Sequence, residues 1–334
     1  MRSYGIYVAK RFAQFLLVVF IGISLTFLIT HMTPIDPVNM MVAGMTTFGQ
    51  SDPEAVEMMR TALRELYGTG APIHEQYLDY WGRMVLLDFG PSLSSFPTPV
   101  ADLIGRALPW TFGLLITCTL IAWTLGNLLG GLAGYYRDNK ALKVFGVVAM
   151  GFHPIPYYII AFVLLILFGY LWPILPISGG AAQQIERGFN LDFVLSVLEH
   201  SILPGMSLVL VSIGAWFMGM RALVSNIVTE DFVIYAELGG VSRRRIMPQY
   251  VMRNALAPQV TGLAMSMSGF YNAAIIIEYV FSYPGLGRLL IAGVYAGDYA
   301  LVLGVTAISI IVVSAAVFLI DVVHPLLDPR VQLS

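Results

Sequence analysis

Long stretches without charged residues are the feature that most restricts how this chain can fold. Six of them are predominantly apolar and contain no Asp, Glu, Lys or Arg; they cover residues 12–29, 107–134, 144–170, 201–220, 255–277 and 299–320. A helix needs about 20 apolar residues to cross roughly 30 Å of hydrocarbon. Each stretch is long enough, and none alternates with the period of a strand. The sequence therefore predicts an all-α fold, a polytopic membrane bundle of six transmembrane helices.

The composition of the whole chain agrees with a lipid environment. Hydrophobic residues make up 57% of it and charged residues 11%, whereas soluble globular proteins contain about 25% charged residues. A net charge of -2 without basic runs argues against a nucleic-acid partner. Cys118 is the single cysteine, so an intrachain disulfide is excluded.

The distribution of basic residues predicts the orientation of the bundle. An even number of crossings places both termini on one side of the membrane, and the basic residues expected on that side are Arg2, Lys10, Arg11, Arg137, Lys140, Lys143, Arg221, Arg243, Arg244, Arg245, Arg253 and Arg330. The short loops opposite hold Arg187 and Arg288, while the long first loop is exempt because long loops are translocated regardless of charge. Both termini are therefore expected in the cytoplasm.

We expect three parts along the chain. An N-terminal segment with the first transmembrane helix covers residues 1–33, an extracytoplasmic helical region covers 34–106, and a five-helix transmembrane core covers 107–334. The core contains a long cytoplasmic loop at 221–254.

The extracytoplasmic region carries the signals of two helices. Ser51 and Glu54 have capping-box spacing, with Pro53 in the first turn, and Gly68 would end the helix that they start. In a second helix, one face is formed by Ile73, Tyr77, Trp81 and Met84. We expect this region to lie on the membrane surface with that face down.

Glycines and prolines mark two further features of the core. Gly126, Gly130 and Gly134 recur four residues apart, and this spacing predicts the close packing of two helices in preference to a hinge. Pro154 and Pro156 predict a kink in the third helix.

The six apolar stretches lack groups that would drive transport by themselves. Ionisable residues inside membranes mark proton relays and ion sites, but Glu278 and Asp321 only flank the stretches, where we expect interfacial carboxylates. A phosphate-binding loop needs a Gly-Lys pair, and none of Lys10, Lys140 and Lys143 follows a glycine. The energy source is therefore expected on another chain.

Enzymatic and metal-binding patterns are equally scarce. The histidines His31, His74, His153, His200 and His324 are scattered along the chain without a second ligand at metal-binding spacing. No paired-carboxylate or nucleophile-elbow motif is present. We expect no enzymatic activity, no metal site and no cofactor on this chain.

The loop at 221–254 is the segment with the most local structure. Thr229 is expected to cap a short helix with Glu230 and Asp231 in its first turn, and Gly239-Gly240 to end it in the left-handed conformation. Ser242 would start a second helix. The pattern indicates a compact knob that a soluble partner could hold; a solvated positive loop is the alternative.

A family resemblance rests first on this loop. The run from Asp231 to Arg245, continued by Arg253-Asn-Ala-Leu-Ala-Pro258, resembles the coupling loop of permease subunits of binding-protein-dependent ABC importers of the dipeptide and oligopeptide branch. The matching positions are Ala236, Gly240, Ser242, Arg244, Arg253, Asn254, Ala255 and Pro258.

The resemblance extends over nearly the whole chain. Further matching motifs are Pro34-Ile-Asp-Pro37, residues 76–92, Pro99-Val100, Leu108-Pro109, Glu278 to Leu290, Asp298-Tyr299 and Leu327-Asp-Pro-Arg330. The sequence departs from the family pattern at Ile35, Glu237, Gly239 and Pro248.

The resemblance implies a type I importer permease fold in a bacterial or archaeal inner membrane. It implies a second, related permease subunit, two cytoplasmic ATPases that bind ATP and Mg, and an extracytoplasmic substrate-binding protein. The residues that it implies for ATPase coupling are Glu230, Asp231, Tyr235, Ala236, Glu237, Gly240, Ser242, Arg243, Arg244 and Arg253. Ser212, Ser268 and Asn272 are candidates for the translocation path.

Two questions stay open at the level of sequence. This family branch serves peptides, nickel and oligosaccharides; peptide and oligosaccharide are equally good substrates here, and nickel is disfavoured because the helices offer no histidine or cysteine cluster. A carrier or channel that works alone, and a membrane scaffold that transports nothing, are the alternatives to an importer subunit.

Overall fold

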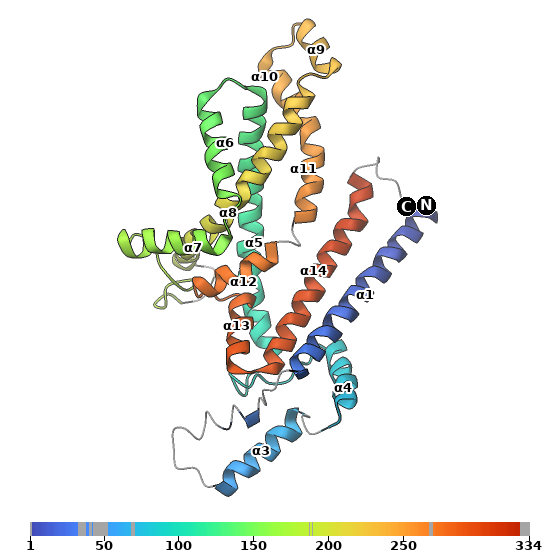
Figure 1. The fold of residues 1–334 in the computed structure, drawn as a ribbon, viewed down its shortest axis with the longest axis vertical. Helices are drawn as coiled ribbons and strands as arrows, with labels where there is room; N and C mark the ends of the chain where they lie inside the picture. Colours follow the sequence, from blue (N-terminus) through green and yellow to red (C-terminus); the bar gives the residue numbers. More distant parts are fainter. Residues whose placement is uncertain are drawn as a thin grey trace. The chain divides into compact units, whose positions relative to one another are not determined.

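The computed structural model describes residues 2–32, 38–39, 42, 53–67, 71–186, 188, 190–266 and 270–327. Within these residues every named element is a helix (Figure 1). Several sequence features lie outside them: the Pro34–Pro37 motif, the Ser51 cap, the Gly68 stop, Ser268 and the motif end at Asp328–Arg330. The side chain of Asn272 also lies outside the description.

The helices follow each other along the chain with short connections. They are α1 (Arg2–Met32), α3 (Pro53–Tyr67), α4 (Ile73–Val85), α5 (Val100–Tyr135), α6 (Lys140–Phe152), α7 (Tyr157–Leu165), the π-helix η1 (Ile166–Leu171), α8 (Leu191–Ile227), α9 (Asp231–Leu238), α10 (Arg243–Arg245), the π-helix η2 (Ile246–Met252), α11 (Arg253–Ser266), α12 (Phe270–Val280), α13 (Leu286–Ala296) and α14 (Tyr299–Leu327).

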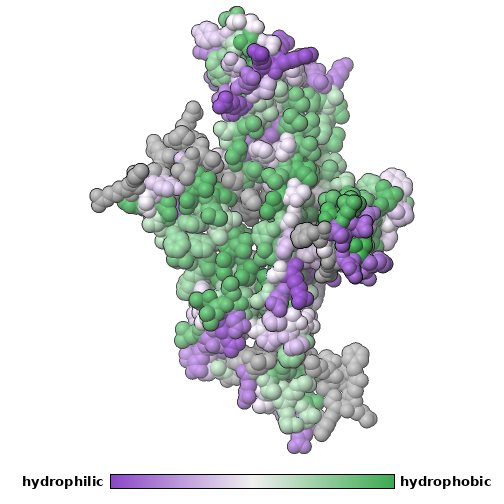
Figure 2. Space-filling model, turned by 180° about the vertical axis from the view of Figure 1, so that it is seen from behind, coloured by the Kyte–Doolittle hydropathy of each residue, from purple (hydrophilic) through white to green (hydrophobic). Residues whose placement is uncertain are grey.

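The prediction of a helical membrane protein is confirmed, with a different count of spans. Four described helices, within α1, α5, α8 and α14, are long and apolar enough to cross a membrane, and the bent pair of α6 with α7–η1 would make a fifth. The sixth apolar stretch, residues 255–277, is divided between α11 and α12. Apolar residues also dominate the surface seen in Figure 2, as lipid contact requires.

The chain divides into two compact units. One contains Met1–Tyr7, Phe112–Tyr283 and Ala316–Ser334, and the other contains Val8–Thr111 and Pro284–Ala315. We describe each unit by itself.

In the first unit, α6, α7, α11 and α12 all contact α8. The predicted kink of the third apolar stretch is present, since the axes of its two helices differ by 104°. Pro156 stands at the N-cap of α7 with φ -57° and ψ 140°. A proline lacks the N–H that a continuous helix needs and disfavours the helical conformation of the residue before it, so Pro154 and Pro156 end α6 and restart the chain.

The glycines of α5 pack directly on α8, as predicted. A Cβ atom at Gly126 would lie 2.5 Å from the Cβ of Trp216, and one at Gly134 would lie 2.8 Å from the carbonyl oxygen of Arg221. One at Gly130 would collide with the backbone carbonyl of Phe217. The two helix backbones therefore approach as closely as small residues allow.

Glu278 corrects one expectation. The uncharged stretch ends at Ile277, but α12 continues to Val280, and Glu278 is 0% exposed inside the protein. The expectation of an interfacial carboxylate at this position was wrong, because the end of an apolar run is not the end of a helix.

In the second unit, α4 packs on α1. Ile23, Met84 and Ala307 form a buried cluster with Trp81 among its neighbours, and the Tyr77 hydroxyl lies 2.7 Å from the Ser24 hydroxyl. The predicted amphipathic face thus contacts α1 and not the membrane surface, which corrects the expected placement. Burial under this face raises the pKa of the Tyr80 phenol.

The second unit also contains a buried carboxylate. Asp298 is 0% exposed and accepts hydrogen bonds from the Ser92 hydroxyl, from the Ser94 backbone (2.9 Å) and from the Ser94 hydroxyl (3.0 Å). Its other oxygen accepts from the backbone of Leu301 (3.0 Å) in the first turn of α14. The charge is therefore stabilised by several donors, which fasten the loop before α5 to the start of α14.

Candidate functional site

The segment between α8 and α11 forms a separate projection of the first unit, the α9–α10 knob (residues 228–253), at the top of Figure 1. It contains α9, a glycine turn, α10 and η2. Polar and charged side chains gather at the same end in Figure 2. This is the loop that the sequence marked as the most structured one.

The α9–α10 knob has its own hydrophobic core. The buried members of this core are Met220, Val224, Val233, Ile246, Val251 and Ala255. The first two belong to α8 and the last to α11, so the core joins the knob to both helices. Complete burial of a Val or Ile side chain contributes about 1.5–3 kcal/mol, enough to hold this short segment in one conformation.

The end of α9 is formed as predicted, with Gly240 as the left-handed residue. Gly240 has φ +77°, whereas Gly239 has φ -72°. The N–H of Gly240 donates to the Glu237 carbonyl (3.0 Å), and the N–H of Val241 donates to the Ala236 carbonyl (3.1 Å). These two bonds are the Schellman arrangement, which favours glycine at its left-handed position.

The start of α9 differs from the prediction. The helix begins at Asp231 after Glu230, and the Glu230 side chain makes no capping hydrogen bond. Thr229 does not cap α9; its hydroxyl donates to the Asn226 carbonyl (2.7 Å) at the end of α8. Thr229 therefore serves the preceding helix, because its hydroxyl can reach a carbonyl left free in the last turn.

The second half of the knob is more irregular than expected. Ser242 stands at the N-cap of α10, as predicted, without a side-chain cap. After Arg245 the chain continues as the π-helix η2, which contains Pro248. A proline cannot donate to the carbonyl four residues earlier, here that of Arg244, so an α-helical bond is missing at this point. The departure at Pro248 coincides with a wider helix.

Both apolar and charged side chains are exposed on the knob. On α9, Tyr235 is 71% exposed and Leu238 is 79% exposed, and Phe232 and Ile234 are also exposed. The predicted coupling residues that share this exposure are Glu230, Asp231, Tyr235, Glu237, Gly240, Ser242, Arg243, Arg244 and Arg253. Ala236 instead contacts the core of the knob.

The sequence-based prediction missed Phe232, Ile234 and Leu238. The signal was present, because α9 reads Asp-Phe-Val-Ile-Tyr-Ala-Glu-Leu and is apolar on all sides. A short helix of this kind at the edge of a protein cannot bury every apolar residue in one core. The remainder forms a surface with the composition of an interface, apolar at its centre and charged around it.

Only one of the three proposed path residues can be located. Ser212 is 6% exposed, and its hydroxyl lies 3.4 Å from the Tyr157 hydroxyl. It lines a small cavity together with Leu115, Cys118, Thr119 and Leu208. Within the described chain, Ser212 thus lies inside the packing of α5, α7 and α8.

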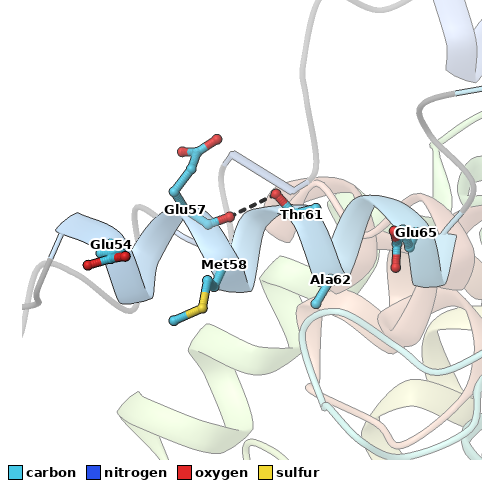
Figure 3. Close-up of a pocket in the computed structure, with 6 residues that line it drawn as sticks. All are labelled: Glu54, Glu57, Met58, Thr61, Ala62 and Glu65. Atoms are coloured by element: carbon cyan, nitrogen blue, oxygen red, sulfur yellow. Dashed lines mark hydrogen bonds between the residues drawn. The ribbon is translucent and has the colours of Figure 1, made fainter.

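A second depression lies on α3 (Figure 3). It is lined by Glu54, Glu57, Met58, Thr61, Ala62 and Glu65. All six come from one helix, and the Thr61 hydroxyl donates to the Glu57 carbonyl (3.0 Å) as in any helix interior. In the described residues no group of three or more His, Cys, Asp or Glu side chains is arranged to hold a metal ion. The depression is a shallow feature of a helix surface.

Comparison with known proteins places the knob in a family. Residues 126–333 match the family described as binding-protein-dependent transport system inner membrane component. The match covers well over half of the chain and includes the whole α9–α10 knob.

Curated relatives match nearly the full length. The oligopeptide transport system permease protein AppB of Bacillus subtilis is 26% identical over 318 residues, which cover 94% of this chain and 95% of the relative. The dipeptide transport system permease protein DppB of Lactococcus lactis is 23% identical and covers 98% and 99%. The glutathione transport system permease protein GsiC of Escherichia coli is 27% identical and covers 98% of both chains.

Proposed function

The chain belongs to the family of binding-protein-dependent transport system inner membrane components, and from this premise we propose that it forms half of the translocation path of an ATP-driven peptide importer. Its apolar helices and its relatives make it a multi-pass protein of the inner membrane. The path would switch between inward-facing and outward-facing states when partner ATPases bind and hydrolyse ATP.

The α9–α10 knob is the observation that carries this proposal. It is a folded projection with a core of its own, yet it leaves Tyr235 and Leu238 largely exposed. A loop that only met solvent would need neither feature. A surface that is rigid, apolar at its centre and charged at its margin suits a protein partner that binds repeatedly in one orientation.

The energy argument points to the same surface. Concentrating a solute a thousandfold costs about 4 kcal/mol, at about 1.4 kcal/mol for each factor of ten. The sequence has no phosphate-binding loop that could supply this energy. The work would reach the chain through contact, and the knob is where we propose that contact occurs.

The proposal includes partners and an orientation. A second, related permease subunit would complete the path, two ATPases would bind ATP and Mg, and an extracytoplasmic binding protein would deliver the substrate. The knob and both termini would face the cytoplasm, which agrees with the arginines Arg243, Arg244 and Arg245 on the knob.

We propose peptides as the substrate class. The three relatives described above are named for oligopeptide, dipeptide and glutathione transport. Oligosaccharides, which the sequence leaves open, have no comparable support.

Charge reversal on the knob tests the coupling role. Arg244→Glu and Gly240→Asp each place a negative charge on an exposed part of the proposed ATPase contact. We expect ATP-driven uptake by the reconstituted complex to fall at least about tenfold, because unfavourable charge pairs at an interface cost a kcal/mol or more. Insertion of the chain into the membrane should stay normal.

Lys140→Glu is the matched control, since Lys140 is exposed at the start of α6 on the same expected side of the membrane. It should transport at the wild-type rate. Full uptake by both knob variants would refute the coupling role.

A further inference from the structure

A small group of polar side chains joins α5 to α11 within the apolar part of the first unit. It consists of Trp123 and Asn127 on α5 and Gln259 on α11. Asn127 is 2% exposed and Gln259 is 7% exposed. Polar side chains buried between membrane helices are costly unless they bond to one another or to the backbone, so their position requires an explanation.

The bonds of this group cross between helices. The indole Nε1–H of Trp123 donates to the backbone carbonyl of Gln259 (3.1 Å). The Asn127 amide donates to the Trp123 carbonyl (2.7 Å) within α5. The Gln259 side chain lies against Gly219 of α8, since a Cβ atom at Gly219 would be 3.0 Å from its Nε2. The group therefore connects α11 to α5 and places it against α8.

The helices on the two sides of this connection have different attachments. The Gly126, Gly130 and Gly134 contacts hold α5 on α8 backbone to backbone, so these two helices form one rigid body. In contrast, α11 begins immediately after η2, and its Ala255 belongs to the core of the α9–α10 knob. A displacement of the knob therefore acts first on α11.

Pro258 lies between these two attachments. It is inside α11, three residues after Ala255 and one before Gln259. Because Pro258 has no N–H, the carbonyl of Asn254 lacks its usual helical donor, and the helix is weakened where it leaves the knob. The bond from Trp123 reaches the residue directly after this weak point.

We propose that the Trp123–Gln259 hydrogen bond is a strut that transmits movement of the α9–α10 knob to the α5–α8 pair. Without it, α11 would bend at Pro258 when the knob moves, and the movement would not reach α5. Trp123 is thus a positioning residue for coupling. This inference rests on the proposed function and deepens it.

The test compares two tryptophans that both contact α11. Trp123→Phe removes the donor and keeps an aromatic ring. Trp216→Phe is the matched control, because Trp216 is also half-buried and its ring packs on α11, where a Cβ atom at Gly262 would lie 3.4 Å from it. The readout is the amount of peptide taken up per ATP hydrolysed by the assembled complex in lipid vesicles.

We expect Trp123→Phe to lower this ratio about fivefold while ATP hydrolysis continues, since a hydrogen bond between membrane helices contributes on the order of the free energy that corresponds to this factor. Trp216→Phe should keep the wild-type ratio. An unchanged ratio in Trp123→Phe, or an equal fall in both variants, would overturn the strut.

A second variant keeps the test informative if Trp123→Phe assembles poorly. Pro258→Ala restores the N–H that donates to Asn254, so Trp123→Phe should recover most of its ratio in the Pro258→Ala background. No recovery would contradict bending at Pro258. Failure of the wild-type complex to show ATP-driven uptake would instead count against the proposed function itself.

Discussion

Replacing Leu238 with aspartate is expected to abolish ATP-driven uptake while the chain still folds. Leu238 is 79% exposed at the end of α9, so its removal takes little from the folded chain. If it lies at the centre of the ATPase contact, a buried carboxylate there would cost about 2 kcal/mol or more, which is about thirtyfold in affinity. The measurement is co-purification of the ATPase subunits with the variant, followed by uptake in vesicles.

Leu191→Asp serves as the control for this variant. Leu191 is 72% exposed and begins α8, the helix whose other end leads to the knob. Aspartate is favourable in the first turn of a helix, so Leu191→Asp should retain the ATPases. A Leu238→Asp chain that binds its ATPases and transports normally would show that the exposed face of α9 is not the contact.

Replacing Gly130 with valine is expected to prevent correct packing of the first unit. A Cβ atom at Gly130 would collide with the backbone carbonyl of Phe217 on α8, and a backbone cannot rotate away as a side chain can. Overpacking of this kind costs about 1–3 kcal/mol, and occasionally more when the backbone must move. We expect the variant to lose its monodisperse peak in detergent and to unfold at a lower temperature.

Gly113→Val tests whether valine itself is harmful in α5. Nothing lies within 4 Å of the position that a Cβ atom at Gly113 would occupy. This variant should therefore be as stable as the wild type. If Gly130→Val matched it in stability, the close contact of α5 and α8 would be wrong.

The features that depend on local chemistry could be predicted from the sequence. Apolar length predicts helices in a membrane protein because lipid offers no partner to an open backbone. The Gly126, Gly130 and Gly134 spacing predicted the contact with α8, and the prolines predicted the bend before α7. Gly240 was predicted to be left-handed because few other residues adopt that conformation without strain.

Features that depend on tertiary packing were missed. The division of residues 255–277 into α11 and α12 and the burial of Glu278 cannot be read from an apolar run. The amphipathic face of α4 met α1 because a helix of the same chain competes with the membrane for an apolar surface. The bond between Trp123 and Gln259 joins residues 136 positions apart, a distance at which local patterns carry no information.

The candidate site shows the same division. Most of the proposed coupling residues are exposed together on the knob, because the capping signals define where its helices begin and end. The apolar residues Phe232 and Leu238 were overlooked because charge attracted the interpretation. Whether a short apolar helix buries or exposes a given residue depends on the core beneath it, here the one that contains Val233 and Ile246.

The central claim is that this chain is driven through contact by separate ATPases. The most direct measurement purifies it with the neighbouring subunits of its complex, reconstitutes the complex in lipid and records ATP hydrolysis with a peptide-loaded or an oligosaccharide-loaded binding protein. We expect the peptide-loaded binding protein to stimulate hydrolysis and peptide to accumulate in the vesicles. If no ATPase co-purifies and solute still crosses the bilayer, the chain acts as a carrier or channel by itself, and the account is contradicted.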